Sequence, residues 1–510
     1  MHPDFDASAI AYIDAQTGHS ISYGELRKQV QFASAGLRKF GVKPGDVVLI
    51  LCHNCIEFGI ILLAVMSMGA IVTTTNPLNH STEIAKQAAD SRAVFVASLR
   101  SLLDKVAGLK LPLILMEYAD VKTLQSQTMQ FPCCIGFREL LASNSEIALP
   151  HVGSQDDIAA LLYSSGTTGV SKGVILTHRN FIAQVYLLHF SPVGLPWNAR
   201  IYLCLIPMFH VYGMAFFATG LLAKGSTVVL QQKFDFVKTL EAIQKYRVTH
   251  MPAVPPIVIA LAKLSIVDKF DLSSLVTIGS GAAPLSREVI DSFLSRFPWI
   301  NLVQGYGLTE TTAVGSGLAT EEEAKHFGSA GLLAANTELK IVDIDSLQPL
   351  PPNQNGELWI RGPTVMRGYF GRPSETAATI DEDGWLHTGD LGYVDAEGYI
   401  YIVDRLKELI KYKGLQVAPA ELEAVLLSHP SIIDAAVIPF PDNKAGQIPM
   451  AFVVKDPHHA LKEAEVLKFV AEQVAPYKKV RRVVFVGSIP KSASGKILRR
   501  ELASAAMSKL

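Results

Sequence analysis

The chain has 510 residues, of which 49% are hydrophobic and 18% charged, so it carries enough apolar material for several large cores. Disorder as the main state is excluded, because disordered chains are rich in charge and poor in core-forming residues. Lys and Arg number 46 and Asp and Glu number 47. This balance argues against a nucleic-acid-binding protein, whose affinity would come mainly from neutralised phosphates.

The first long apolar stretch, Phe58–Val72, is too short for a membrane-spanning helix. A second stretch, Ile201–Ala223, is interrupted by Pro207, His210 and Gly213, which favours a buried strand, a turn and a buried helix. We therefore expect no transmembrane segment. We also expect no signal peptide, because the acidic N-terminus is not followed by an apolar core.

The five cysteines are too few for a disulfide scaffold, and their number is odd. Cys52 and Cys55 form a C-x-x-C, but Cys133 and Cys134 are adjacent and supply no second zinc-type pair. We interpret all five as free thiols in a reducing compartment, rather than as ligands of a metal or a redox centre.

Short apolar runs alternate with helical stretches from Asp46 to about Gly307. Runs buried on both faces belong to parallel sheets covered by helices. The expected strands are Val47–Leu51, Ile71–Thr75, Ala93–Ala97, Ala159–Tyr163, Thr227–Leu230 and Val276–Ile278. The fold class predicted for the large part is therefore α/β, with layered βα subdomains.

The sequence pattern changes near residue 335, where short strands with Gly and Pro turns predict a small β-rich subdomain over about 335–404. We place the domain boundary at the end of this subdomain, with an N-terminal domain at 1–404 and a mobile α+β C-terminal domain at 405–510. The elements expected in the latter are a helix opened by Pro419, strands at Ile433–Ile438, Ala451–Val454 and Val483–Val486, and a helix at Glu463–Val474.

A hydroxyl-rich loop, Tyr163-Ser-Ser-Gly-Thr-Thr-Gly-Val-Ser-Lys172-Gly173, follows one of the apolar strands. Backbone N–H groups, hydroxyls and a lysine in such a loop can surround phosphates. The loop differs from a Walker A loop because Ser171 precedes Lys172 instead of following it. The sequence therefore predicts a phosphate-binding loop of another type.

This loop resembles the phosphate-binding signature of the acyl-adenylating superfamily, and further motifs follow in the order of that family. They are Pro207-Met-Phe-His210, Ser280-Gly-Ala-Ala-Pro284, Gln304-Gly-Tyr-Gly-Leu-Thr-Glu310, His387-Thr-Gly-Asp390, Val403-Asp-Arg-Leu-Lys407, Lys411-Tyr-Lys-Gly-Leu-Gln416 and Pro490-Lys-Ser-Ala-Ser-Gly-Lys496. The resemblance covers nearly the whole chain and is greatest to plant 4-coumarate–CoA ligases and their peroxisomal ligase-like relatives. It implies an AMP-forming acid–CoA ligase.

The resemblance implies a nucleotide site for ATP and Mg²⁺. Asp390 and Arg405 would hold the ribose, and Glu310 would be the carboxylate associated with Mg²⁺. The motif segment from Gly305 to Glu310 follows a buried strand, at the strand end where α/β proteins bind ligands, and would contact adenine and phosphates. The remaining nucleotide-binding residues expected are Ser164, Ser165, Gly166, Thr167, Thr168, Lys172, Gln304, Gly305 and Thr309.

The catalytic residues implied are Lys496, Lys411, Gln416 and His210. Lys496, in a basic tail, resembles the adenylation lysine, a mobile charge suited to the α-phosphate. Lys407 resembles a hinge residue around which the C-terminal domain would rotate between two half-reactions. Lys413, Gly414 and Lys233 resemble contacts for coenzyme A.

A carboxylic acid is already ionised near neutrality, so the first step needs cations and hydrogen-bond donors rather than a nucleophile. Carboxylate and ATP would give acyl-AMP and pyrophosphate, and coenzyme A would then displace AMP. The mixed anhydride reacts with water, so a closed, dry site is expected.

The residues expected to line the acyl pocket are Tyr212, Gly213, Phe216, Ser280 and Ala282. The hydroxycinnamate enzymes usually carry a larger residue where Gly279 stands, so Gly279 would widen the pocket. Phe216 replaces their small polar residue, which removes a hydrogen-bond partner for a polar acyl group. We expect a tolerant apolar pocket for fatty acids or jasmonate-precursor-type acids, with a 4-coumarate- or cinnamate-specific ligase as the alternative.

The last three residues, Ser508-Lys509-Leu510, form a peroxisomal address, so we expect peroxisomal localisation and recognition by the import receptor. Three other functions stay open: a luciferase-type oxidation of the adenylate, transfer to a carrier protein, and a non-catalytic nucleotide or acyl sensor. The sensor would be expected to have lost Lys496, Glu310 or Asp390, and all three are present.

Overall fold

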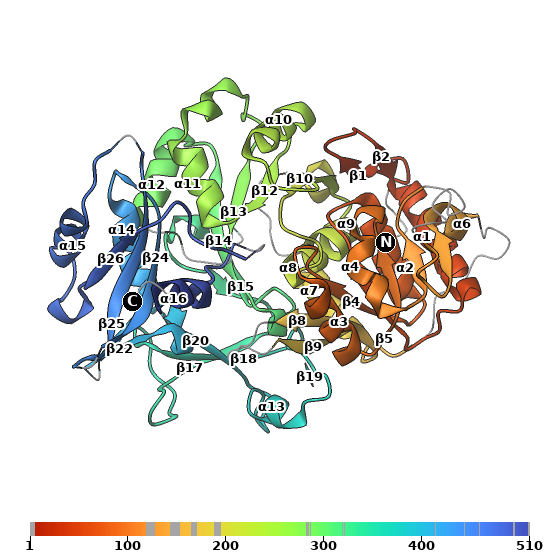
Figure 1. The fold of residues 1–510 in the computed structure, drawn as a ribbon. Helices are drawn as coiled ribbons and strands as arrows, with labels where there is room; N and C mark the ends of the chain where they lie inside the picture. The colour runs from red at the N-terminus through yellow and green to blue at the C-terminus, as the bar shows by residue number, and fades with distance from the viewer. Residues whose placement is uncertain are drawn as a thin grey trace.

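The computed structural model describes residues 6–118, 128–142, 153–164, 171–187, 195–281, 285, 287–318, 320, 322–413, 415–442, 444–457, 459–492 and 495–507. Figure 1 shows a sheet of the N-terminal residues on one side of the green β12–β14 region and the C-terminal domain, in blue, on the other. The fold is mixed α/β, as predicted.

An eight-stranded sheet, counted over the described residues, has the order β19-β9-β8-β4-β3-β5-β6-β7. Its strands are β3 (Val47–Leu51), β4 (Ile71–Thr75), β5 (Ala93–Ser98), β6 (Leu113–Leu115), β7 (Cys134–Gly136), β8 (Ile158–Ser164), β9 (Lys172–Thr177) and β19 (Gly368–Tyr369). The helices of this region are α1 (Tyr23–Phe40), α2 (Ile56–Ser67), α3 (Ser81–Asp90), α4 (Leu103–Val106), α6 (Phe137–Leu141) and α7 (His178–Leu187). Strands β3 to β8 pair in parallel, whereas β9 runs antiparallel to β8.

A nine-stranded sheet, again within the described part of the chain, has the order β16-β15-β14-β13-β12-β10-β11-β1-β2. Its strands are β1 (Ile10–Asp14), β2 (Ser20–Ser22), β10 (Ile201–Cys204), β11 (Thr227–Leu230), β12 (His250–Ala253), β13 (Thr277–Ser280), β14 (Asn301–Tyr306), β15 (Ser316–Gly317) and β16 (Leu332–Leu333). The helices that follow its strands include α10 (Phe236–Tyr246), α11 (Pro255–Lys263) and α12 (Arg287–Arg296). One face of β10, β12 and β13 presents Leu203, Met251 and Ile278 to a fully buried apolar core.

The strand, turn and helix predicted over Ile201–Ala223 are present, but the helix is irregular. Strand β10 is followed by a turn, by α8 (Val211–Gly213), by a π-helical turn η6 (Met214–Gly220) and by α9 (Leu221–Ala223). Across the described residues, no helix combines the length and apolar character that crossing a bilayer requires.

Two smaller sheets complete the described fold. One joins β17 (Glu338–Val342), β18 (Gly356–Arg361), β20 (Leu386–Val394) and β21 (Ile400–Arg405) in that order, with α13 (Pro373–Ala377) between its strands. The other contains β22 (Ile410–Tyr412), β23 (Leu415–Val417), β24 (Ile432–Asp442), β25 (Gly446–Lys455) and β26 (Arg482–Phe485), with α14 (Pro419–Ser428), α15 (Glu463–Ala471) and α16 (Arg499–Met507). The chain passes from one sheet to the other between Arg405 and Ile410, near the predicted boundary at 404, which stays a prediction.

The cysteines are free thiols. Cys52 and Cys55 lie between β3 and α2 with their Sγ atoms 3.4 Å apart. The hydrogen bond between them, and then burial, raise the pKa of Cys55. Among the described residues no cluster of three or more His, Cys, Asp or Glu side chains is arranged to hold a metal.

Candidate active site

The predicted phosphate-binding loop follows β8. Ser164 ends β8 and pairs in register with Lys172, the first residue of β9. The Lys172 side chain is buried, and its Nζ lies 4.8 Å from the centre of the Tyr369 ring, so an aromatic face stabilises the cation. The predicted residues Ser165, Gly166, Thr167 and Thr168 lie outside the described residues.

The Glu310 carboxylate faces this strand junction. Its Oε1 accepts hydrogen bonds from the Ser164 hydroxyl at 2.8 Å and from the Tyr369 hydroxyl at 3.1 Å. Glu310 lies in a short 3₁₀ turn after β14, and the turn needs Gly307, because a Cβ there would lie 2.1 Å from the Ala313 carbonyl oxygen. Two sheets therefore meet at one carboxylate.

Asp390 forms the second anionic point of the site. Its carboxylate accepts a 2.6 Å hydrogen bond from the Tyr306 hydroxyl and lies 3.2 Å from Arg405 Nε. Burial raises the pKa of Asp390, while Arg405 and the Tyr306 hydrogen bond act in the opposite direction. Paired strands β20 and β21 bring Asp390 directly opposite Arg405.

The other described residues predicted to contact the nucleotide, Gln304, Gly305 and Thr309, lie in β14 or in the turn that follows it. The Gln304 side chain accepts a hydrogen bond from Leu285 N at 3.0 Å and donates one to Ser329 O at 3.5 Å. Gly305 pairs with Gly317 of β15, and Thr309 begins the 3₁₀ turn that carries Glu310. Gln304 and Gly305 therefore order the strand end on which a nucleotide would lie.

The Lys496 amine lies among the charges of this centre. Burial lowers the pKa of Lys496 most, Arg405 lowers it further, and Asp390 and Glu310 raise it. Its loop is seated on the large domain, because a Cβ at the preceding Gly495 would lie 2.9 Å from a methyl of Val254. The described arrangement thus joins the C-terminal loop to the residues predicted to bind the nucleotide.

His210 lies at the start of α8, where its Nδ1 accepts a hydrogen bond from Tyr212 N at 3.3 Å. Burial, and then the Lys496 charge, lower the pKa of His210 to about 4, so the imidazole is neutral near neutral pH. A neutral imidazole with one nitrogen engaged can still donate or accept one hydrogen bond at Nε2.

A buried amide that the sequence analysis did not single out anchors the loop before His210. Asn54 accepts a 2.8 Å hydrogen bond from Met208 N and donates to Ile206 O at 3.3 Å and to Gln231 O at 3.2 Å. Gln231 in turn donates to the Lys233 carbonyl at 3.1 Å. One side chain therefore connects the His210 loop to the segment that carries Lys233.

The aromatic residues predicted for the acyl pocket pack together, with ring centres of Tyr212 and Phe216 5.6 Å apart. Gly213 has a packing reason to be glycine, because a Cβ there would lie 2.1 Å from Pro207 O. Ser280 is buried, and its hydroxyl has no hydrogen-bond partner among the described residues. Ala282 lies outside the described residues.

The residues predicted for the second half-reaction lie on exposed segments. Lys411 pairs in register with Gln416 across β22 and β23, and both are exposed, as are Lys413, Lys407 and Lys233. The structure places none of these five side chains in the buried centre described above. Gly414 lies outside the described residues.

The donor set fits a Mg²⁺ ion shared with phosphates. Glu310 offers one carboxylate with the Ser164 hydroxyl beside it, and Mg²⁺ in nucleotide sites typically takes one or two carboxylates together with phosphate oxygens and waters. A cage made only of protein ligands is not formed by the described residues. Glu310 would therefore hold the ion only together with the nucleotide.

Tyr369 was assigned no role from the sequence, and Tyr306 was assigned none beyond its place in the segment predicted to contact adenine and phosphates. Tyr306 is part of the Gln304–Glu310 motif, so the sequence could have indicated it. Tyr369 reaches the site only because β19 pairs with β9, which no local sequence pattern indicates. Each tyrosine donates its hydroxyl to a site carboxylate.

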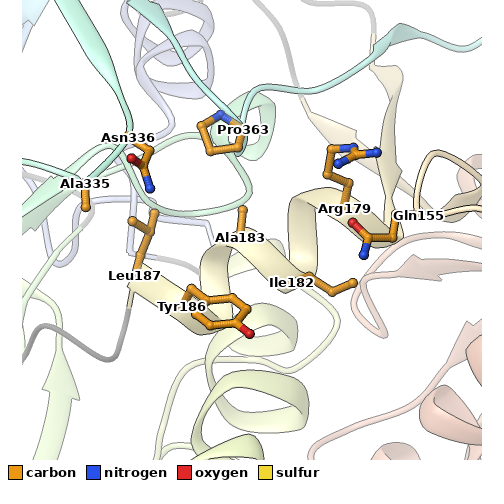
Figure 2. Close-up of a pocket in the computed structure, with 9 residues that line it drawn as sticks. All are labelled: Gln155, Arg179, Ile182, Ala183, Tyr186, Leu187, Ala335, Asn336 and Pro363. Carbon is orange, nitrogen blue, oxygen red and sulfur yellow. The ribbon is translucent and has the colours of Figure 1, made fainter.

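A separate cavity of about 220 Å³ lies beside α7 (Figure 2). Its lining residues are Gln155, Arg179, Ile182, Ala183, Tyr186, Leu187, Ala335, Asn336 and Pro363, and none is a predicted site residue. Figure 2 shows these side chains coming from α7 and from the segments that face it.

Comparison with known families gives two matches. The family described as AMP-binding enzyme matches residues 3–370, and the family described as AMP-binding enzyme C-terminal domain matches residues 421–496.

Two plant relatives match almost the whole chain. The probable CoA ligase CCL5 of Humulus lupulus is 49% identical over 504 residues, covering 98% of this chain and 91% of that protein. The peroxisomal OPC-8:0-CoA ligase 1 of Arabidopsis thaliana is 49% identical over 509 residues, with the same coverage.

Solved structures have the same fold. The o-succinylbenzoate CoA synthetase MenE of Bacillus subtilis, in complex with the acyl-adenylate intermediate, has a TM-score of 0.80 at 29% identity, covering 97% of this chain and 95% of that one. ATP-bound MatB of Rhodopseudomonas palustris has a TM-score of 0.86 at 24% identity, covering 99% and 97%.

Proposed function

This chain belongs to the AMP-binding enzyme family and is an AMP-forming acid–thiol ligase that uses ATP and coenzyme A, and from that premise we propose its residue roles, its substrate class and its compartment. The observation that supports the proposal most is that the charges of Asp390, Arg405 and Glu310 all act on the pKa of Lys496, whose loop packs on Val254 of the large domain.

In the first half-reaction, Asp390 and Arg405 hold the ribose, and Lys172 and the loop after Ser164 hold the phosphates. The substrate carboxylate attacks the α-phosphorus, and pyrophosphate leaves. Lys496 stabilises the charge that develops on the α-phosphate oxygens. Mg²⁺, held by Glu310 and the phosphates, would supply further charge neutralisation.

In the second half-reaction, the coenzyme A thiol attacks the acyl carbon and AMP leaves. Lys496 then withdraws, as the C-terminal domain rotates about the Lys407 region. The exposed β22–β23 hairpin, with Lys411, Lys413, Gly414 and Gln416, turns towards the site. Lys233 contributes to the binding of coenzyme A.

The proposed substrate is a fatty acid or a jasmonate-precursor-type acid, with hydroxycinnamate-type acids as the second candidate. The aromatic, apolar surroundings of Phe216 support the first, and a relative named as an OPC-8:0-CoA ligase is compatible with it. We propose a peroxisomal location, with import through the C-terminal Ser508-Lys509-Leu510, which lies outside the described residues. That relative, named as peroxisomal, supports this location.

A panel of carboxylic acids scored for ATP- and coenzyme A-dependent thioester formation tests the substrate proposal. We expect C6–C18 fatty acids and cyclopentenone-type acids to be converted better than cinnamic acids. Cinnamic acids that exceed the fatty acids tenfold would contradict the proposed substrate class. Light emission with oxygen uptake would favour a luciferase-type oxidation instead, and acyl transfer only to a carrier protein would favour a carrier-loading function.

A further inference from the structure

The face of the nine-stranded sheet opposite the apolar core carries buried polar side chains. Side chains alternate along strands, so residues paired in register share a face. His250 of β12 is in register with Tyr202 of β10 and with Thr277 of β13. Their neighbours Met251 and Ile278 point into the apolar core on the other side.

Two buried atoms on this face lack a partner. His250 is 4% exposed, and its Nε2 makes no hydrogen bond to any described residue. The buried Thr277 Oγ1 likewise has no partner among the described residues. Leaving such a group unpaired is unfavourable, because it has lost its hydrogen bonds to water. A buried polar atom without a partner calls for an explanation, and a hydrogen-bonding group supplied by a ligand is one that fits a face beside the acyl pocket.

His250 is held neutral and in a fixed orientation. Its Nδ1 lies 2.8 Å from Thr249 Oγ1, and burial followed by the Arg200 charge lowers its pKa to about 3. The ring also packs on Tyr202, with 4.8 Å between centres. Whichever tautomer is present, Nε2 is free to accept or to donate one hydrogen bond.

The same face continues into the predicted acyl pocket. Tyr202 packs edge-to-face on Phe216 with 5.7 Å between ring centres. Further along β13, a Cβ built at Gly279 would have Val303 at 3.8 Å as its only neighbour within 4 Å in the described part of the chain. Gly279 and Thr277 are also only partly buried, although β13 is a central strand. Gly279 therefore leaves room for an atom against β13 on this face, two residues from Thr277.

We propose that His250 and Thr277 form a polar subsite at the deep end of the acyl pocket, which binds a hydroxyl or ketone oxygen far from the substrate carboxylate. The inference rests on the proposed function and narrows its substrate class. Gly281 lies beside the predicted pocket, since a Cβ there would be 3.9 Å from the ring of Tyr212. Thr277 lies four residues before Gly281, and four residues span about 13 Å along a strand. The favoured substrates are therefore medium-chain acids that carry an oxygen function near their distal end.

The test compares kcat/KM for pairs of saturated C8 to C14 acids, with and without a hydroxyl or oxo group near the far end of the chain. We expect the native enzyme to prefer the oxygenated member of the best pair at least tenfold, because a buried polar group rejects a substrate that leaves it unpaired. A ketone preference indicates a donating Nε2–H, and an alcohol preference indicates an accepting Nε2. No preference in any pair would overturn the subsite.

Thr277→Val removes the hydroxyl at nearly constant shape, and His250→Phe removes Nε2. Each should bring the preference ratio close to one. Ser274→Ala is the matched control, since that hydroxyl is already bonded to Val248 O at 2.8 Å, and the ratio should stay at the native value. If His250→Phe fails to fold, the test rests on Thr277→Val. An unchanged preference ratio in the Thr277→Val enzyme would overturn the proposal. If the native enzyme converts none of these acids but does convert others, the proposed substrate class fails instead.

Discussion

At the scale of single residues, the site depends on hydroxyl groups that orient its two carboxylates. Tyr306 donates to Asp390, and Ser164 and Tyr369 donate to Glu310. A carboxylate held by a donor in this way keeps its remaining lone pairs aimed at the ligand. The tyrosines act through the carboxylates and so are positioning residues.

Replacing Tyr306 with Phe removes the 2.6 Å hydrogen bond to Asp390. A hydrogen bond to a charged group contributes about 1.5–3 kcal/mol, so we expect KM for ATP to rise about tenfold or more. Steady-state kinetics at saturating acid measure this. Tyr393→Phe is the control, because Tyr393 stacks on Tyr401 away from the carboxylates. An unchanged KM in Tyr306→Phe would show that the hydroxyl does not orient Asp390.

The neutral imidazole of His210 predicts a pH dependence of stability. Its pKa in the folded protein is lowered from 6.5 to about 4, mainly by burial. The unfolded chain therefore binds this proton first on acidification, and stability is lost as the pH falls from about 6.5 towards 4. We expect the Tm of His210→Gln to fall less than that of the native protein over this range. Equal slopes would contradict the neutral, buried state of His210.

At the scale of elements, the sequence predicted strands best where an apolar run ends sharply. Val47–Leu51, Ile71–Thr75 and Thr227–Leu230 are confirmed to the residue, because each is buried and bounded by polar or glycine-rich turns. Helix α15 was predicted to end at Val474 but ends at Ala471. A helix end depends on local capping contacts, which an apolar period does not encode.

The site was less predictable than the strands. The motifs located Asp390, Glu310 and Lys496, whose roles stay predictions, because polar residues in a fixed order at strand ends are a local signal. Asn54 carried no such signal, since its partners lie about 150 residues or more further along the chain. The π-helical turn η6 was also missed, because it follows from tertiary packing.

Asn54 allows a test at this scale, because it joins the loops before His210 and Lys233. We expect Asn54→Leu to lower kcat/KM at least tenfold and to destabilise the fold by roughly 1–3 kcal/mol, because three backbone groups lose their partner. Gln87→Leu is the matched control, since Gln87 is a buried amide bonded to Thr74 O at 2.9 Å, outside the site. If both variants lose the same stability and keep the same activity, Asn54 has only a structural role.

At the scale of the whole molecule, the C-terminal domain has its own sheet and its own apolar core. It touches the large domain through the loop around Gly495, which brings Lys496 to the nucleotide residues. The residues proposed for the thioester step lie on an exposed hairpin of that same domain. One domain thus carries both proposed sets of residues, and we propose that a rotation presents them to the site in turn.

The half-reactions of Lys496→Ala test this account most directly. Adenylate formation is measured by pyrophosphate release, and thioester formation is measured from a supplied acyl-adenylate and coenzyme A. We expect adenylation to fall by at least 100-fold, as for removal of one preorganised charge, while thioester formation stays within about threefold of native. Lys491→Ala, which removes a neighbouring lysine paired with Asp434 at 2.6 Å, should leave both half-reactions intact. Equal losses of both half-reactions in Lys496→Ala would contradict the account.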